Sequence, residues 1–297
     1  MKKIISTLLI AVLAISLAAC GTNANSSSKP EKIIMGFVPS QESDKIADTV
    51  KPLADKLSEE LGVEVEGQVM TNYTALVEAM GSNKVHIGFI PAFGYVLANE
   101  KHGVNVILKS ERNGSGTYKA QYVVKSDSGI ESLEDLRGKT WAYADATSTS
   151  GYLFPAAQLM EKFNVENLET DFFGETVQSG SHDNAAIAVL NGDADVATTF
   201  DDVRAVLEKD YPEIMDQLTV IDYTDEIPND TISVTKDLDE ELVNKIKETF
   251  LSFNNDEEMI EVMQEVYSWN AIIEAQDSEY SVVKETYNKF KDDITLD

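Results

Sequence analysis

A run of hydroxyl side chains lies where a predicted strand gives way to a predicted helix. The stretch is Ala146-Thr147-Ser148-Thr149-Ser150-Gly151-Tyr152; it follows an apolar segment at 140–144 and precedes a segment at 153–163 with apolar residues three and four apart. A helix start carries backbone N–H groups without intrahelical partners and the positive end of the helix dipole. With three or four hydroxyl donors added, this pattern predicts an anion-binding site that needs no Lys or Arg.

A simpler interpretation of the same stretch is a helix cap. Ser148 or Ser150 could cap the helix with one side-chain oxygen, and Pro155 falls in its first turn, where the missing N–H costs little. One cap accounts for one hydroxyl, whereas four consecutive hydroxyl residues precede Gly151. The sequence alone leaves both interpretations open.

Further polar residues stand at predicted strand ends and helix starts. They are Tyr73, Tyr118, His182, the pair Asp201-Asp202, and Asp230. Each has an ordinary structural explanation when taken alone: a buried tyrosine with a satisfied hydroxyl, a surface histidine, a helix cap, a turn. His182 would donate a hydrogen bond to an anion, and would be charged if the anion raises its pKa. The ordered set favours one shared site.

The motifs of common enzymes are missing from the sequence. No Gly-x-Ser-x-Gly elbow surrounds Ser148 or Ser150, and there is no Cys-His pair, His-Glu-x-x-His motif or phosphate-binding loop. Three scattered histidines lack metal-ligand spacing. A carboxylate set from Asp201, Asp202 and Asp230 is the remaining catalytic alternative. We therefore expect a binding protein with no enzymatic activity, no metal and no cofactor.

Predicted strands and helices alternate along the chain from residue 31. This alternation predicts an α/β fold with mostly parallel strands, in which ligands bind at the carboxyl ends of the strands. The predicted strands are 32–38, 63–70, 85–90, 104–108, 118–125, 140–144, 168–173, 195–199, 218–222 and 231–235. The predicted helices are 43–61, 73–80, 93–99, 153–163, and shorter ones that start near 132, 181 and 201. A polar connector is expected at 224–230, and helix for the rest of the tail.

The order of these elements predicts two lobes. Residues 118–225 form a second α/β unit inserted into a first lobe, which consists of 31–117 and 226–297.

The first thirty residues are expected to lie outside the fold. Residues 1–19 have Lys2 and Lys3 followed by a short apolar run, which is typical of a signal peptide. The run ends in Leu17-Ala18-Ala19-Cys20-Gly21, which resembles a bacterial lipobox that places a lipid on Cys20, the only cysteine. An ordinary secretory signal is the alternative. Residues 20–30 are polar and are expected to form a flexible, lipidated tether.

The charge balance limits the kinds of partner. The sequence has 24 basic and 52 acidic residues, a formal net charge of −28. This charge argues against nucleic acid as a partner. Because the long-range field repels anions, an anionic ligand must be held by short-range hydrogen bonds and dipoles.

Several short motifs, in this order, resemble the phosphonate- and phosphite-binding lipoproteins of bacterial ABC importers, the PhnD-like group of solute-binding proteins. The motifs are Asn72-Tyr73, Asn83-Lys84-Val85-His86-Ile87, Tyr118, Ser148-Thr149-Ser150-Gly151-Tyr152-Leu153, His182-Asp183-Asn184, Asp195-Val196-Ala197-Thr198 and Ile227-Pro228-Asn229-Asp230. The resemblance covers essentially the whole body of the chain.

The resemblance implies a type II periplasmic-binding-protein fold with a ligand cleft between two lobes, which are joined by crossovers near Tyr118 and Asp230. It implies that phosphonate oxygens are held by Ser148, Thr149, Ser150 and the Gly151 N–H, with Tyr73, Tyr118 and His182 as further oxygen ligands. Asp230 and either Asp201 or Asp202 would hold the amine of an aminophosphonate or close the site around a smaller anion.

The function that follows is an extracytoplasmic, lipid-anchored receptor that captures a small phosphorus oxyanion by lobe closure. Its expected partners are ABC permease subunits and the membrane, and it is expected to be monomeric. The alternatives are the same fold with phosphate, phosphite or a sulfonate as ligand, or a role as a sensor; a lipid-anchored hydrolase is the least favoured.

Overall fold

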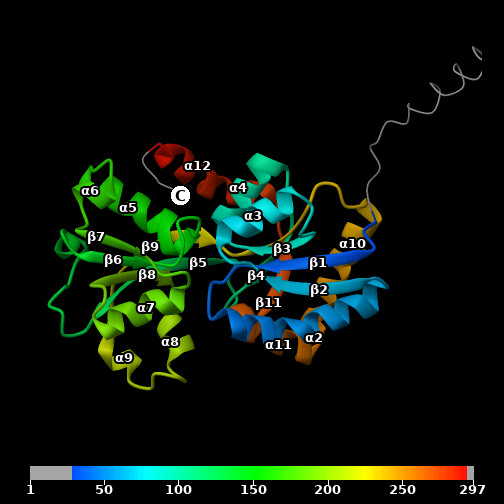
Figure 1. Ribbon diagram of the computed structural model, residues 1–297, viewed down its shortest axis with the longest axis horizontal. Coiled ribbons are helices and arrows are strands. Elements are labelled where there is room, and N and C mark those ends of the chain that lie inside the picture. Colours follow the sequence, from blue (N-terminus) through cyan, green and yellow to red (C-terminus); the bar gives the residue numbers. More distant parts are fainter. Residues whose placement is uncertain (1–28, 293–297) are drawn as a thin grey trace, which may run out of the picture.

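Each of two lobes is built on its own β-sheet in the computed structural model, which describes residues 29–292 (Figure 1). The first sheet has the strand order β11-β4-β10-β3-β1-β2 and the second has β7-β6-β8-β5-β9. The strands are β1 Lys32–Phe37, β2 Glu64–Val69, β3 Ile87–Ile90, β4 Asn105–Glu111, β5 Thr117–Lys125, β6 Thr140–Tyr143, β7 Glu175–Gln178, β8 Val196–Phe200, β9 Leu218–Pro228, β10 Thr231–Val234 and β11 Ala271–Glu274. The predicted two-lobed α/β fold is confirmed.

Helices cover both faces of the first sheet. The helices α2, α10 and α11 lie on one face, and α3, α4 and α12 lie on the other (Figure 1). Their bounds are α2 Ser43–Leu61, α3 Tyr73–Gly81, α4 Ala92–His102, α10 Glu240–Ser252, α11 Glu257–Tyr267 and α12 Ser281–Phe290. The apolar stripe of α2 is buried and the helix ends at Gly62, whose φ of 69° is the left-handed conformation that glycine favours.

The second sheet is covered by α5 and α6 on one face and by α7, α8 and α9 on the other (Figure 1). These helices are α5 Phe154–Phe163, α6 Leu168–Asp171, α7 His182–Asn191, α8 Val203–Leu207 and α9 Ile214–Gln217. The described part of the chain also contains four short helical turns: η1 Leu133–Leu136, η2 Thr149–Leu153, η3 Phe253–Asn255 and η4 Asp277–Tyr280.

Both sheets are mixed: most strands of each sheet run in one direction, as predicted, but β5, β10 and β11 run against it. The strands β1, β2 and β3 are parallel, as are β6, β7 and β8. However, β10 enters the first sheet antiparallel to both β3 and β4, and β5 lies antiparallel to β8 and β9. The first strand that the chain forms after each crossing between the lobes, β5 in the second sheet and β10 in the first, therefore runs against its neighbours.

Residues 168–173 were predicted to form a strand and instead begin with helix α6. The side chain of Asn167 accepts hydrogen bonds from the amides of Glu169 and Thr170 at 2.9 and 3.0 Å, which caps a helix. Leu168, Phe172 and Phe173 are buried at helical rather than alternating spacing. The strand of this unit, β7, begins only at Glu175.

Two predictions near the carboxyl end were also wrong. The segment 224–230 is largely strand rather than connector, because β9 continues to Pro228, which pairs with Thr117 of β5. The tail contains strand β11 between its helices, where it pairs with β4 through the buried Ile272.

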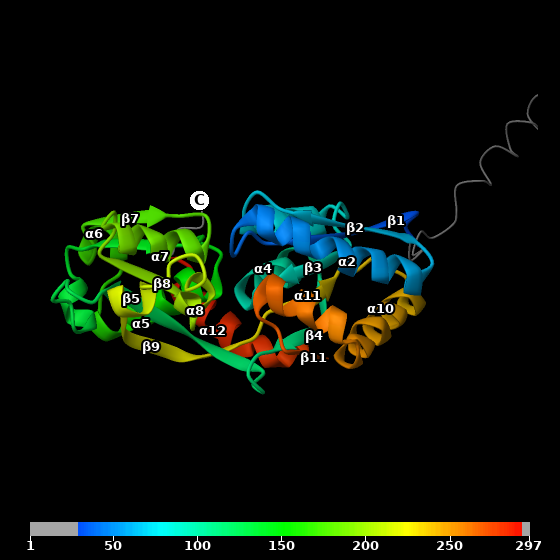
Figure 2. The same cartoon turned by 90° about the horizontal axis from the view of Figure 1, so that it is seen from below.

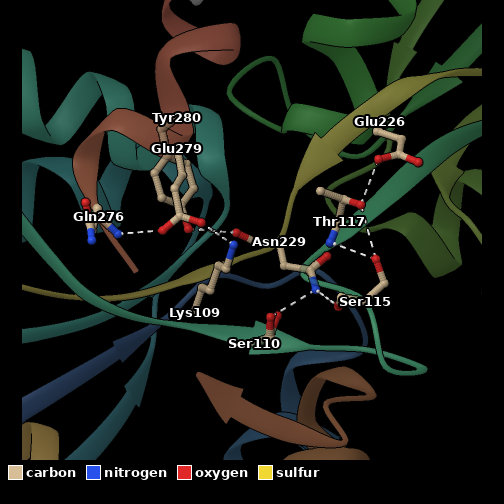
Figure 3. A network of polar contacts seen from close by, with 9 residues as sticks. All are labelled: Lys109, Ser110, Ser115, Thr117, Glu226, Asn229, Gln276, Glu279 and Tyr280. Carbon is tan, nitrogen blue, oxygen red and sulfur yellow. Dashed lines mark hydrogen bonds and ion pairs between the residues drawn. The ribbon is translucent and has the colours of Figure 1, made fainter. Parts of the chain in front are cut away.

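Asn229 joins the two segments that connect the lobes (Figure 3). Its side-chain Nδ2 donates to the carbonyl of Ser110 at 3.0 Å and to that of Ser115 at 2.8 Å. Its own carbonyl accepts a hydrogen bond from the hydroxyl of Tyr280 at 3.1 Å. Figure 2 shows the long strands β5 and β9 running together from the second sheet toward the first. The connecting segments are thus fastened to each other and to the first lobe.

Within residues 29–292, no helix is both long and apolar enough to cross a membrane. The predicted signal peptide and the lipidation of Cys20 lie outside the described residues, as does most of the predicted tether.

Candidate functional site

A cavity of about 30 Å³ lies where the two sheets face each other. The carboxyl ends of β1, β3 and β4 point toward it from the first lobe, and the loops after β6 and β7 reach it from the second. Its wall consists of Val38, Ser40, Gln41, Tyr73, Phe89, Pro91, Arg112, Tyr118, Ser148, Ser150, His182, Phe200, Asp230 and Tyr267. Strand ends from both lobes thus meet at one enclosed space, as expected for open α/β sheets.

The hydroxyl-rich stretch enters the cavity through a single π-helical turn, η2. The backbone N–H of Leu153 bonds to the carbonyl of Ser148 at 3.1 Å, five residues back, and such turns are frequent at functional sites. Tyr152 stacks on Trp141 of β6 with ring centroids 5.3 Å apart, which fixes the turn against the sheet. The Ser148 and Ser150 side chains therefore face the cavity from a rigid support.

The sequence also predicted that Thr149 and Gly151 bind the ligand, but neither lines the cavity. The Thr149 hydroxyl oxygen accepts a hydrogen bond from the amide of Phe93 in α4 at 2.9 Å. The Gly151 amide donates to the Ser148 hydroxyl at 3.0 Å, so this serine also acts as a helix cap. The helix-cap interpretation therefore holds for Ser148, and the anion-site interpretation stays a prediction.

Buried donors without partners gather in the cavity wall. Within residues 29–292, the Tyr73 hydroxyl and His182 Nδ1 have no hydrogen-bond partner. A buried donor left unpaired costs free energy, so such groups are rare without a functional reason. The predicted residues Tyr73, Tyr118 and His182 all lie in this wall, with hydroxyl or ring nitrogen donors available to an anion.

His182 starts helix α7, whose cap is Ser181. The residue is 4% exposed, and Nε2 lies 3.4 Å from the Ser148 hydroxyl. Burial, with the positive charge of Arg112 as the smaller cause, lowers the pKa of His182 to about 3. The imidazole is therefore neutral at pH 7 in this arrangement, and it offers an N–H donor rather than a charge.

Arg112 was not identified from the sequence, and it is the one arginine or lysine in the cavity wall formed by the described residues. It directly follows β4, and its Nη2 lies 2.9 Å from Oδ2 of Asp230. The guanidinium carbon lies 5.4 Å from the Tyr118 ring centroid and 5.6 Å from that of Phe200. The available signal was a basic residue at the carboxyl end of a strand that points to the site.

The three acidic candidates lie in two different places. Asp230 lines the cavity and pairs with Arg112. Burial raises the pKa of Asp230, and the positive charge of Arg112 opposes this rise. Asp201 and Asp202 do not line the cavity; they border a wider outer depression that shares Arg112, Tyr118 and Phe200 with it. Of the ten predicted ligand-binding residues, the structure thus brings six together: Tyr73, Tyr118, Ser148, Ser150, His182 and Asp230.

The rest of the cavity wall is largely apolar and was missed by motif reasoning. Phe89, Phe200 and Tyr267 contribute aromatic rings, and Phe89 belongs to a stacked pair with Phe37, at 4.4 Å between centroids. No cluster of three or more metal-ligating side chains occurs within residues 29–292. The site can therefore hold a small molecule with a polar, anionic end and a compact apolar remainder.

An enclosed site between two lobes, with donors from both, defines the class of bilobed solute receptors. Residues 35–280 match the family described as ABC transporter, phosphonate, periplasmic substrate-binding protein, and the chain belongs to this family. The protein is therefore the extracytoplasmic substrate-binding component of an ABC importer and not an enzyme, and the predicted family is confirmed.

Relatives agree with this assignment. The chain is 29% identical over 234 residues to the phosphate-import protein PhnD of Mycolicibacterium smegmatis, which covers 74% of this chain and 71% of the relative. It is 27% identical over 267 residues to the phosphonates-binding periplasmic protein of Escherichia coli, covering 88% and 78%. The structure of PhnD1 from Prochlorococcus marinus in complex with methylphosphonate has a TM-score of 0.79 at 21% identity, covering 89% of this chain and 99% of that one, and supports the type II fold.

Proposed function

We propose that the protein captures a small phosphorus oxyanion, most simply a phosphonate, in the cavity between its lobes. The observation that carries the proposal is the convergence of five neutral donor side chains from both lobes on one enclosed space: Tyr73, Tyr118, Ser148, Ser150 and His182. A phosphonate group offers three acceptor oxygens in tetrahedral directions, which such a set of donors can surround.

Hydrogen bonds carry the recognition in this proposal. The chain has a net charge of −28, so its long-range field does not attract an anion. Inside the cavity the dielectric is low and each donor acts more strongly than in water. The start of α7 at His182 adds the positive end of a helix dipole.

Binding is proposed to be coupled to lobe closure. The amide of His182 donates to the carbonyl of Ser40 at 3.0 Å, and Thr149 bonds to Phe93 of α4, so hydrogen bonds cross the cleft beside the site. We assign residues 31–117 and 226–297 to one lobe and 118–225 to the other, with Asn229 fastening the connection. The importer's membrane subunits would then recognise the closed form.

We also propose that Cys20 carries a lipid that anchors the receptor, as a monomer, at the outer face of the cell membrane, with 20–30 as the tether. Support comes from the lipobox-like Leu17-Ala18-Ala19-Cys20-Gly21. Expression of a Cys20→Ala variant in the native host tests this: the variant should move from the membrane fraction to the soluble fraction. Retention in the membrane fraction would remove the anchor from the proposal.

Calorimetric titration of the full chain in mild detergent tests the ligand class. The panel is methylphosphonate, phosphite, 2-aminoethylphosphonate, phosphate and methanesulfonate. Binding of phosphonates or phosphite above phosphate and sulfonate supports the proposal. A preference for phosphate would match the name of the mycobacterial relative and replace the phosphonate assignment; no binding across the panel by folded protein would overturn it. Uptake of the bound compound by cells separates transport from sensing.

A further inference from the structure

We propose that Arg112 sets the choice of ligand: by occupying the carboxylate of Asp230, it makes the site select phosphorus oxyanions without a cationic substituent. The inference rests on the proposed function and narrows it from phosphonates in general to those with a hydrogen or a small apolar group on phosphorus. It also reverses the role that the sequence suggested for Asp230, which was to hold a ligand amine.

The pairing of the two residues is close and mostly shielded from solvent. Arg112 Nη2 and Asp230 Oδ2 are 2.9 Å apart, and the two side chains are 14% and 18% exposed. A buried ion pair resists loss of one partner, because the remaining charge would then be uncompensated. A ligand ammonium would have to displace the guanidinium from the carboxylate or share it.

Two aromatic rings hold the guanidinium in place. Its carbon lies over Tyr118 at 5.4 Å and over Phe200 at 5.6 Å from the ring centroids, within the range of cation–π attraction. Both rings also line the cavity. The arginine is therefore held from two directions besides its ion pair, and its displacement by a ligand would cost these contacts as well.

The positive charge of Arg112 favours an anionic group and disfavours an ammonium group next to the Arg112–Asp230 ion pair. Within residues 29–292, the Nε of Arg112 is buried without a hydrogen-bond partner, so the guanidinium retains a donor for an oxyanion. A ligand ammonium next to this group would meet a like charge at short range and low dielectric. The wall also contains the rings of Phe89, Phe200 and Tyr267, which suit a hydrogen or a methyl group on phosphorus.

The Tyr267 hydroxyl has a fixed orientation, and its oxygen keeps its acceptor capacity. It donates to the carbonyl of Val38 at 2.9 Å, which fixes its orientation toward the backbone of the first lobe. Asp201 also lies near Arg112, whose positive charge opposes the rise in the pKa of Asp201 caused by burial, but Asp201 is outside the cavity wall. Asp230 is thus the one carboxylate in the wall formed by the described residues, and it is paired.

A matched pair of ligands tests the inference. Ethylphosphonate and aminomethylphosphonate have the same number of heavy atoms and differ by a methyl group against an ammonium. Calorimetry with the full chain should give the wild type a preference for ethylphosphonate of about tenfold or more, as expected for a like-charge contact worth over a kilocalorie. In R112Q the freed carboxylate of Asp230 should shift the preference toward aminomethylphosphonate by about tenfold.

Two further variants serve as controls. Arg137→Gln makes the same change at an exposed arginine outside the cavity wall, which also lies over two rings, those of Phe163 and Phe172, at 5.0 and 4.8 Å. In this variant the ratio of the affinities for ethylphosphonate and aminomethylphosphonate should equal that of the wild type. In the double variant R112Q/D230N the shift in preference toward aminomethylphosphonate should disappear. Circular dichroism melting confirms that each variant is folded.

The outcomes separate this inference from the proposed function. Equal affinity of the wild type for the two ligands, or an unchanged ratio in folded R112Q, would overturn the inference and leave Arg112 a structural role. Binding of methylphosphonate but of neither matched ligand would show that size rather than charge selects, which also overturns it. If the folded wild type binds no phosphonate or phosphite at all, the proposed function itself fails.

Discussion

The hydroxyl of Thr149 and the amide of Phe93 form a 2.9 Å hydrogen bond that joins the second lobe to the first. The amide lies in the first turn of α4, where helices have no internal acceptor for their N–H groups. A side chain from one lobe therefore caps a helix of the other. This contact exists only when the lobes are together, so it favours the closed form without touching the cavity.

Replacing Thr149 with valine removes the acceptor and keeps the shape of the side chain. The Phe93 amide would then be buried without a partner in the closed form, at a cost of roughly 1–3 kcal/mol. We expect the affinity for every ligand of the panel to fall by a similar factor, because closure and not recognition is weakened. Calorimetry across the panel measures this, and a loss restricted to some ligands would indicate instead that Thr149 contacts the ligand.

Removal of a hydroxyl that does line the cavity should have a different signature. In Ser150→Ala one phosphonate oxygen loses its donor, and binding should weaken by roughly 1–3 kcal/mol. The loss should depend on the ligand, because it follows the oxygens that the ligand presents. Unchanged calorimetric affinity for all phosphorus oxyanions would exclude Ser150 from the site.

The contrast between Thr149 and Ser150 also shows how far sequence reasoning reaches. The types and spacing of residues 146–152 predicted a polar turn between strand and helix, since strand, cap and hydroxyl signals are local. Which hydroxyl faces the cavity depends on the π-helical turn η2 and on α4 of the other lobe, and neither can be recognised from the local sequence.

Arg112 was missed for the same reason. Its partner Asp230 is 118 residues away in the chain, and only the crossing of the two connecting segments brings the pair together. The strand β11 escaped prediction because its four residues gain their hydrogen bonds from β4, across more than 150 positions of sequence. The helix α2, whose apolar stripe is a local signal, was predicted with the same bounds that the structure has.

The buried His182 should make stability depend on pH. Its pKa is lowered to about 3 in the folded protein from 6.5 in the unfolded chain. Between these values the unfolded state binds a proton that the native state does not, so the free energy of unfolding rises with pH, by up to about 1.4 kcal/mol per pH unit. This contribution is fully present above pH 6.5 and is lost as the pH falls toward 3.

Comparison with His182→Gln isolates this effect. Urea unfolding at pH 7 and pH 5 should show a smaller loss of stability for the variant than for the wild type. Asp183, whose burial raises its pKa to about 6, acts in the opposite direction and is present in both proteins, so it largely cancels in the difference. Identical pH dependence in the two proteins would mean that His182 titrates normally in the folded state.

Asn229 should be needed for the stability of the connection between the lobes. Its Nδ2 satisfies the carbonyls of Ser110 and Ser115, and the residue is fully buried. Asn229→Ala leaves both carbonyls without this donor, so we expect a loss of about 2 kcal/mol or more in the free energy of unfolding. Urea titration measures the loss, and Asn288→Ala, an exposed asparagine in α12, provides the matched control. If both variants unfold at the wild-type urea concentration, the fastening of the two connecting segments does not depend on the Asn229 amide.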